Sequence, residues 1–212
     1  MKFDDFLYGL ARIFFRTIFF FYHRLSVKWT EPLPKNRSVI IACNHCSYLD
    51  PLIVGVAFHR RLRYFSKEEL FRPFLFGKII RILGAVPVSR ENNAAAAVAL
   101  KGLLKFLKEG SDILIFPEGA RSTDGKLLPL ENGVGLVACH SQAPILPAFI
   151  KGAYEAMPPG SAMIKPVKIT VTFGNLITLT PEDYKKKNAR ERIMATLTDA
   201  LKELELEALE SA

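Results

Sequence analysis

Apolar and polar residues alternate in blocks along most of this chain, and the length and period of each block indicate its secondary structure. Short apolar runs bounded by polar residues, glycine or proline are typical of buried strands. We expect strands at residues 39–43, 63–66, 86–88, 112–116, 145–149 and 168–173. Longer segments with helical spacing predict helices at 51–58, 68–83 with a break at Pro73, 92 or 93 to 108, 133–140, and from 181 towards the C-terminus. This alternation predicts an α/β domain in which helices cover the sheet.

The N-terminal residues 1–29 form a separate, very apolar block with helical spacing. The apolar positions on that spacing are Phe3, Phe6, Leu7, Leu10, Phe14, Ile18, Phe21 and Leu25. Arg12 and Arg16 interrupt the stretch that a membrane-spanning helix would need. Asp4 and Asp5 stand where a signal peptide is basic, so a cleavable leader fits no better.

Two interpretations of this N-terminal helix remain open. It could pack on the sheet as a core helix, or it could lie in a membrane interface. The phenylalanines exceed what one helix face can bury, and the interleaved basic residues can reach lipid headgroups. We therefore predict an amphipathic membrane-associating helix at residues 1–29 and one domain at residues 30–212, peripheral or monotopic on the cytoplasmic face of the cell membrane.

The chain is basic, with a formal net charge of +8 and a pI of about 9.4. Such a charge suits an anionic partner, which could be nucleic acid, a phospholipid surface or a phosphorylated substrate. The basic residues at the N-terminus are interleaved with apolar ones and form no long polar tract. This arrangement favours a phospholipid membrane surface over nucleic acid.

The three cysteines, Cys43, Cys46 and Cys139, show no disulfide-framework spacing and favour a reducing compartment. Cys43 and Cys46 flank His45, which raises a metal site and a thiol nucleophile as alternatives. Both are disfavoured, because a zinc pattern has no second half here and neighbouring Cys and His rarely face one another productively. We expect no metal and no cofactor.

His45 and Asp50 follow the apolar run at 39–43 and stand five positions apart. Five steps of an α-helix rotate the chain by about 500°, which separates the two side chains, so a His–Asp contact requires a loop. At the carboxyl end of a strand, that loop would lie where α/β sheets bind ligands. A carboxylate on one ring nitrogen would fix the tautomer of a general base. The alternative is that Asp50 only caps the helix that begins at Pro51.

A second polar loop follows the expected strand at 112–116. It offers a carboxylate at Glu118, a glycine at Gly119 that allows close backbone approach, and Arg121, whose planar guanidinium suits phosphate. On chemistry alone, Glu118 and Arg121 could equally form a structural ion pair.

These loops resemble conserved blocks of the glycerolipid acyltransferases. Residues 44–50 are similar to the N-H-x-x-x-x-D block of that family, and residues 116–122 to its F-P-E-G-T-R-S block, with Ala120 where threonine is usual. Further similar segments, in the same order, are 67–70, 84–90 and 145–150. Ser89 stands where many relatives carry aspartate, which with Ala120 leaves the acceptor preference open.

The resemblance implies a mostly parallel mixed sheet flanked by helices, and transfer of a fatty acyl group from acyl-CoA or acyl carrier protein to the sn-2 hydroxyl of a lysophosphatidate-like acceptor. It implies His45 as general base with Asp50 orienting it. The implied substrate-binding residues are Lys67, Arg90, Glu118, Gly119 and Arg121. Other acceptors are open alternatives: glycerol 3-phosphate, another lysophospholipid or a lyso-aminolipid.

Two rivals belong to other classes of protein. A hydrolase could use Ser47 or Ser122 as nucleophile, but the sequence lacks a G-x-S-x-G elbow. A non-enzymatic membrane-binding protein would explain the basic aromatic N-terminus but would leave the two polar loops unexplained.

Overall fold

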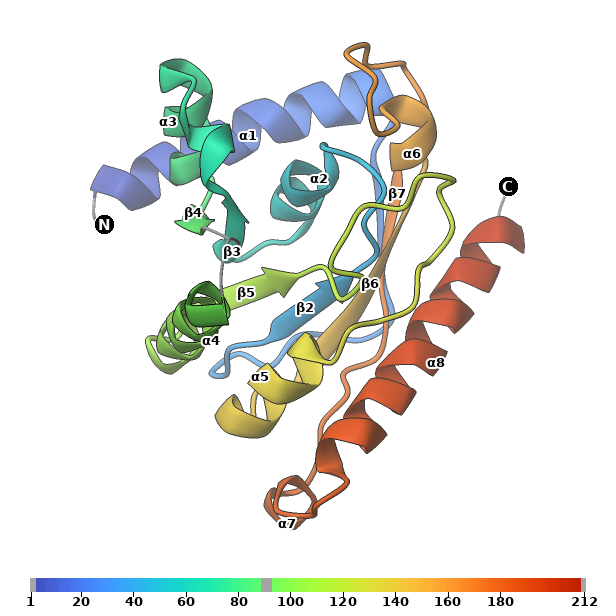
Figure 1. Ribbon diagram of the computed structural model, residues 1–212. Helices are drawn as coiled ribbons and strands as arrows, with labels where there is room; N and C mark the ends of the chain where they lie inside the picture. The colour runs from blue at the N-terminus through green and yellow to red at the C-terminus, as the bar shows by residue number, and fades with distance from the viewer. Residues whose placement is uncertain (1–2, 89–92, 211–212) are drawn as a thin grey trace.

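The computed structural model describes residues 3–88 and 93–210 of the chain (Figure 1). Its centre is a seven-stranded sheet with the strand order β1-β7-β6-β2-β5-β3-β4. Neighbouring strands are parallel except β6 and β7, which run antiparallel. The strands are β1 (Ser26–Trp29), β2 (Ile40–Cys43), β3 (Leu62–Lys67), β4 (Ala85–Val88), β5 (Asp112–Ile115), β6 (Ile145–Lys151) and β7 (Thr170–Phe173). The expected α/β fold with a mostly parallel mixed sheet is confirmed.

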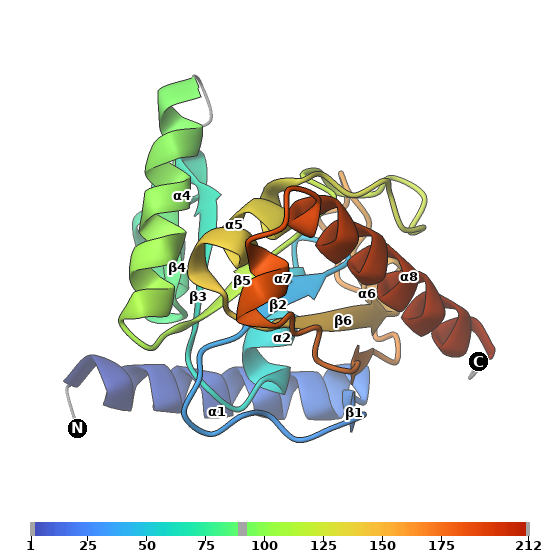
Figure 2. The ribbon, with the colours of Figure 1, turned by 90° about the horizontal axis from the view of Figure 1, so that it is seen from below.

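Helices cover both faces of the sheet, as Figures 1 and 2 show. The helices are α1 (Phe3–His23), α2 (Asp50–Ala57), η1 (Glu68–Phe71), α3 (Phe74–Ile82), α4 (Asn93–Lys108), α5 (Gly133–Ser141), α6 (Ala153–Ala156), α7 (Pro181–Tyr184) and α8 (Ala189–Glu210). Helices α1 and α2 pack on one face, while α4, α5 and α8 pack on the other. The central strand β2 is buried on both sides, since Ile41 and Cys43 join one core and Ile40 and Ala42 join the other.

The N-terminal helix is shorter than the block that predicted it. Helix α1 ends at His23, and Arg24 turns the chain with a positive φ of 47°. Residues Ser26–Trp29 then form the edge strand β1, which pairs in parallel with β7. The expected helix over residues 1–29 is therefore wrong at its C-terminal end, because β1 gains hydrogen bonds from a strand more than 140 residues away. No helix in the described ranges is long and apolar enough to cross a membrane.

Three further observations concern the other helices. The break at Pro73 is confirmed, since η1 and α3 lie on either side of it. The expected C-terminal helix is two helices, because residues 185–188 interrupt it between α7 and α8. The short helix α6 was not predicted, and it follows Gly152, whose φ is 88°.

Candidate active site

The two polar loops meet at one edge of the sheet. Strands β2 and β5 are parallel neighbours, with Ala42 opposite Ile115, so their carboxyl ends lie side by side. The loop after β2 carries His45, and the loop after β5 carries Glu118. The strand arrangement alone therefore brings together residues that are 73 positions apart in the chain.

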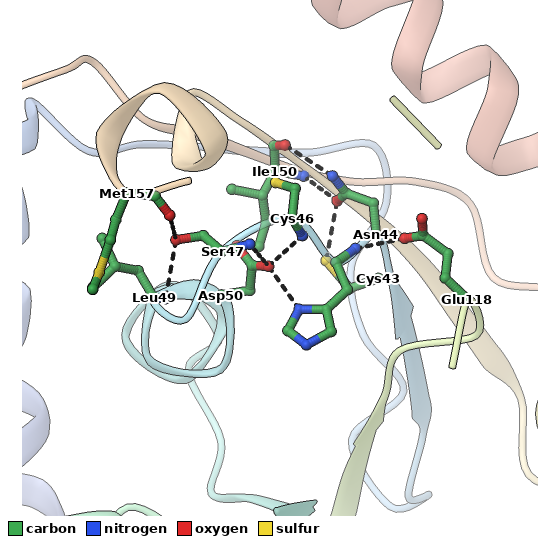
Figure 3. A network of polar contacts seen from close by, with 10 residues as sticks. Cys43, Asn44, Cys46, Ser47, Leu49, Asp50, Glu118, Ile150 and Met157 are labelled. Carbon is green, nitrogen blue, oxygen red and sulfur yellow. Dashed lines mark hydrogen bonds and ion pairs between the residues drawn. The ribbon is translucent and has the colours of Figure 1, made fainter. Parts of the chain in front are cut away.

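The His45–Asp50 contact is formed in the loop. Nδ1 of His45 lies 2.8 Å from Oδ2 of Asp50, whose side chain is fully buried. The same Oδ2 accepts hydrogen bonds from the backbone N–H groups of Cys46 and Ser47, each at 2.7 Å (Figure 3). A carboxylate acceptor holds the proton of the neutral ring on Nδ1, so the lone pair lies on Nε2.

Asp50 does not cap helix α2, so that alternative is wrong. The N-cap position is Leu49, and it makes no side-chain cap hydrogen bond. The Asp50 carboxylate points back to the N–H groups that precede the helix, as Figure 3 shows. These donors fix the carboxylate in the position from which it contacts His45.

His45 is held by its ring and by its backbone. The imidazole stacks on the Phe116 ring, with centroids 4.0 Å apart and an interplanar angle of 15°. The backbone N–H of His45 donates to Oε1 of Glu118 at 2.6 Å, and the backbone C=O of His45 accepts from the N–H of Ser122 at 2.7 Å. The loop after β5 thus holds both backbone polar groups of the histidine. The side chain keeps 19% exposure, which leaves part of the ring open to a substrate.

Glu118 joins the two loops through its carboxylate (Figure 3). Oε1 accepts from the His45 N–H, and Oε2 accepts from the Leu128 N–H at 2.7 Å. Burial raises the pKa of Glu118 to about 7, against the opposing effect of these two hydrogen bonds. Because each oxygen accepts from a backbone N–H, Glu118 holds the two loops together, and its expected role in substrate binding stays a prediction.

Gly119 is required by the path of this loop. Its φ is 68°, in the left-handed region, and an added Cβ would lie 2.6 Å from the Glu131 carboxylate. The glycine therefore shapes the turn that presents Glu118 and Arg121 on the same loop.

Arg121 lies against the loop that carries His45. Its guanidinium stacks over the Tyr48 ring, with Cζ 3.5 Å from the ring centroid. Nη1 of Arg121 is buried and has no hydrogen-bond partner within the described part of the chain. Tyr48 was not predicted from the sequence, because it occupies an unspecified position of the N-H-x-x-x-x-D block. The sequence feature that could have indicated its role is the aromatic side chain, which can stack on an arginine. Glu118 and Arg121 do not form the suggested ion pair in the described loops. Glu118 accepts from backbone N–H groups, and Arg121 stacks on Tyr48.

The other two expected binding residues have different outcomes. Lys67 ends β3, which neighbours β5 in parallel, and its side chain is exposed at the same edge of the sheet. Arg90 lies outside the described residues, so its expected contact with the acceptor stays a prediction.

The alternative nucleophiles are engaged elsewhere. The Ser47 hydroxyl donates to the Met157 carbonyl at 2.8 Å, and the Ser122 hydroxyl donates to Asp124 at 2.9 Å. Burial raises the pKa of the Cys46 thiol, which disfavours the thiolate. These contacts are not those of a serine or cysteine activated by His45.

Known proteins are similar to this chain in sequence and in fold. A family model described as Acyltransferase matches residues 24–151. The 1-acyl-sn-glycerol-3-phosphate acyltransferase of Bacillus subtilis is 33% identical over 180 residues, which cover 82% of this chain and 85% of that protein. The protein of the same name from Cocos nucifera is 30% identical over 170 residues, which cover 79% of this chain but 55% of that protein. The chain thus spans about half the length of this plant relative.

A solved structure extends the similarity to the whole fold. The crystal structure of the 1-acyl-sn-glycerophosphate (LPA) acyltransferase PlsC from Thermotoga maritima superposes with a TM-score of 0.75 at 25% identity, covering 95% of this chain and 81% of that one. The family model covers more than half of the chain and includes both loops around His45. The chain therefore belongs to the acyltransferase family, and it is an enzyme of that class.

Proposed function

We propose that this acyltransferase transfers a fatty acyl group from a thioester to the sn-2 hydroxyl of 1-acylglycerol 3-phosphate, which yields phosphatidic acid. The observation that carries the proposal is a buried carboxylate on Nδ1 of His45, with Arg121 stacked against the same loop. The names of the relatives from Bacillus subtilis and Cocos nucifera support this acceptor.

His45 acts as the general base in this proposal. Nε2 takes the proton from the acceptor hydroxyl, and the oxygen attacks the thioester carbonyl. The C–O bond forms, the C–S bond breaks, and the imidazolium returns its proton to the leaving thiolate. The Asp50 carboxylate stabilises the imidazolium and keeps Nδ1 as the protonated nitrogen. Glu118 and Ser122 contribute by holding the backbone of His45.

Arg121 binds the acceptor phosphate in this proposal. Its buried Nη1 lacks an acceptor among the described residues, and a phosphate oxygen would supply one. Lys67, the last residue of β3, and Arg90, which follows β4 in the sequence, would add positive charge. Phosphate binding beside the His45 loop would hold the acceptor hydroxyl near the base.

The same proposal places the enzyme on a membrane. Helix α1 exposes large apolar side chains, among them Phe14 at 59% and Phe21 at 76%. The exposed Arg16 lies among them, and the exposed Arg24 follows the helix directly. Lysophosphatidate with a long acyl chain resides in such an interface. The cysteines are free, which fits the reducing compartment on the cytoplasmic face, where acyl-CoA or acyl carrier protein would deliver the acyl group.

Product identification by mass spectrometry tests this function. Purified protein receives each thioester donor with each acceptor: lysophosphatidate, glycerol 3-phosphate, another lysophospholipid and a lyso-aminolipid. We expect phosphatidic acid as the main product, and preferential use of another acceptor would refute the proposed substrate.

Two variants test the assigned roles. His45→Ala should abolish turnover while lipid binding survives, and robust activity would refute the base. Arg121→Ala should impair phosphate-bearing acceptors selectively, whereas an equal loss with a neutral acceptor would contradict the phosphate contact.

A further inference from the structure

Several described segments expose bulky apolar side chains, and three of them lie near one another. The first is α1, described above. The second is the first turn of α3, where Phe74 is 83% exposed and Leu75 is 71% exposed. The third is the loop after α6, where Met163 is 70% exposed and Ile164 is 42% exposed. Exposed apolar side chains that gather on one face mark an interaction surface.

These segments lie on the same side of the molecule. Helices α1 and α3 pack against each other, and the Tyr22 hydroxyl of α1 donates to the Ile164 carbonyl at 2.9 Å. Figure 1 shows α1, α3 and the loop after α6 together at the top of the view, while α8 lies away from them. The three apolar sites therefore face the surroundings from one side.

The first turn of α3 is packed closely against η1. An added Cβ at Gly77 would lie 2.5 Å from the Phe71 carbonyl oxygen, so η1 and α3 approach each other closely. Arg81 stacks over the Phe71 ring, with Cζ 4.9 Å from its centroid. This packing fixes the direction in which Phe74 and Leu75 project. A fixed apolar tip can enter a lipid layer without first becoming ordered.

Basic residues border each apolar site. Arg72 and Lys78 flank the tip of α3, and Lys165 and Lys168 follow the exposed loop residues. All four of these side chains are exposed. Glu68, Glu69 and Glu155 are the acidic residues in the adjoining segments. Bulky apolar side chains surrounded by cations are complementary to an anionic lipid surface, in which the apolar groups enter the acyl boundary and the cations meet headgroups.

We propose that the tip of α3 and residues 163–164 bind the membrane together with α1, as a three-part contact. This inference rests on the membrane association in the proposed function and deepens it, because one helix alone would leave the protein free to rotate about the helix axis. Three separated contacts fix the tilt of the domain on the lipid surface. A fixed tilt keeps the loops around His45 at a constant height above the acyl chains.

Vesicle sedimentation of the full-length protein tests the proposal, with vesicles of phosphatidylcholine and phosphatidylglycerol. The test variants are Phe74→Ser/Leu75→Ser and Met163→Ser/Ile164→Ser. The matched control is Leu206→Ser/Leu209→Ser, because these α8 side chains are 61% and 64% exposed. A Phe14→Ser/Phe21→Ser variant tests α1. We expect a loss of partitioning of about tenfold or more for the α3 pair, a smaller loss for the loop pair and no change for the control.

The outcomes separate this inference from the proposed function. Unchanged binding of the α3 and loop variants, with reduced binding of the α1 variant, would overturn the three-part contact and leave the membrane helix standing. Unchanged binding of all three would overturn both. Losses equal to that of the α8 control would also refute the inference. Turnover of a short-chain lysophosphatidate dispersed in solution should stay at the wild-type rate in the α3 and loop variants, which shows that they fold.

A fluorescence measurement gives a second test. Trp29 is the only tryptophan, so Phe74→Trp in a Trp29→Phe background reports on the tip of α3 alone. We expect lipids with brominated acyl chains to quench this fluorescence and to leave Leu209→Trp in the same background unquenched. Absence of quenching at position 74 on bound protein would overturn the α3 contact.

Discussion

Replacing Asp50 by asparagine tests how the proposed base is held. Oδ2 of Asp50 accepts three hydrogen bonds, from Nδ1 of His45 and from the N–H groups of Cys46 and Ser47. Oδ1 is buried and has no hydrogen-bond partner among the described residues. An asparagine side chain has only one carbonyl oxygen. Because all three donors face the position of Oδ2, that oxygen must occupy this position. The amide NH2 then occupies the position of Oδ1, and the tautomer of His45 is preserved.

The expected loss in Asp50→Asn is therefore electrostatic. A full charge about 4 Å from the imidazolium contributes about 4 kcal/mol at an effective dielectric constant of 20. The amide dipole retains part of this stabilisation, so we expect the transition state to lose about 2–3 kcal/mol. That loss lowers the rate of acyl transfer roughly 100-fold. Asp50→Ala also removes the acceptor that fixes the ring, and its rate should fall by about 10⁴ or more.

Single-turnover kinetics at saturating donor and acceptor measures the chemical step for both variants. Unfolding by urea at the same pH shows whether either variant has lost its structure. Equal losses of about 10⁴ in the asparagine and alanine variants would refute the reasoning, because they would mean that the amide does not preserve the tautomer. An asparagine variant as fast as wild type would show that the charge of Asp50 has no part in the reaction.

Three further predictions concern the neighbouring loops. Glu118 has a pKa of about 7 in the folded protein against an ordinary value of 4.5, so it contributes stability that is complete below pH 4.5 and lost as the pH rises through 7. Urea unfolding should show the stability of wild type relative to Glu118→Gln falling by about 3 kcal/mol between pH 4.5 and pH 8, and parallel pH profiles would contradict the raised pKa. Tyr48→Leu should raise the KM for lysophosphatidate roughly three- to thirtyfold, because the stacking on Arg121 is lost, and kcat should be retained. Tyr48→Phe should keep the wild-type KM. A change of kcat in both variants would argue against a role of Tyr48 in positioning Arg121. Gly119→Ala should lower the free energy of unfolding by about 1–2 kcal/mol because its φ is positive, and urea unfolding with an unchanged midpoint would count against that strain.

Much of the site was predictable because its residues follow buried strands. The apolar runs before His45 and Glu118 identify strands, and parallel strands bring their carboxyl ends to one edge. The roles of Asp50 and Glu118 were not predictable in the same way. A carboxylate at the start of a helix, such as Asp50, can cap that helix or can accept hydrogen bonds from N–H groups that precede it in the chain. Only the path of the backbone decides which of these two contacts forms. The contact between Tyr48 and Arg121 likewise joins two loops whose relative position depends on the register of β2 and β5.

The sequence by itself determined the alternation of strands and helices from residue 39 onwards, the place of His45 and Asp50 directly after one strand and the apolar character of α1, because each follows from periodicity or short spacing. The tertiary structure decided the end of α1 at His23, since β1 exists only through its pairing with β7. It also decided that Glu118 holds the backbone of His45, and that the tip of α3 lies on the same side as α1. The physical reason is the same in each case: a contact between distant segments depends on sheet register and packing, which local sequence patterns do not encode.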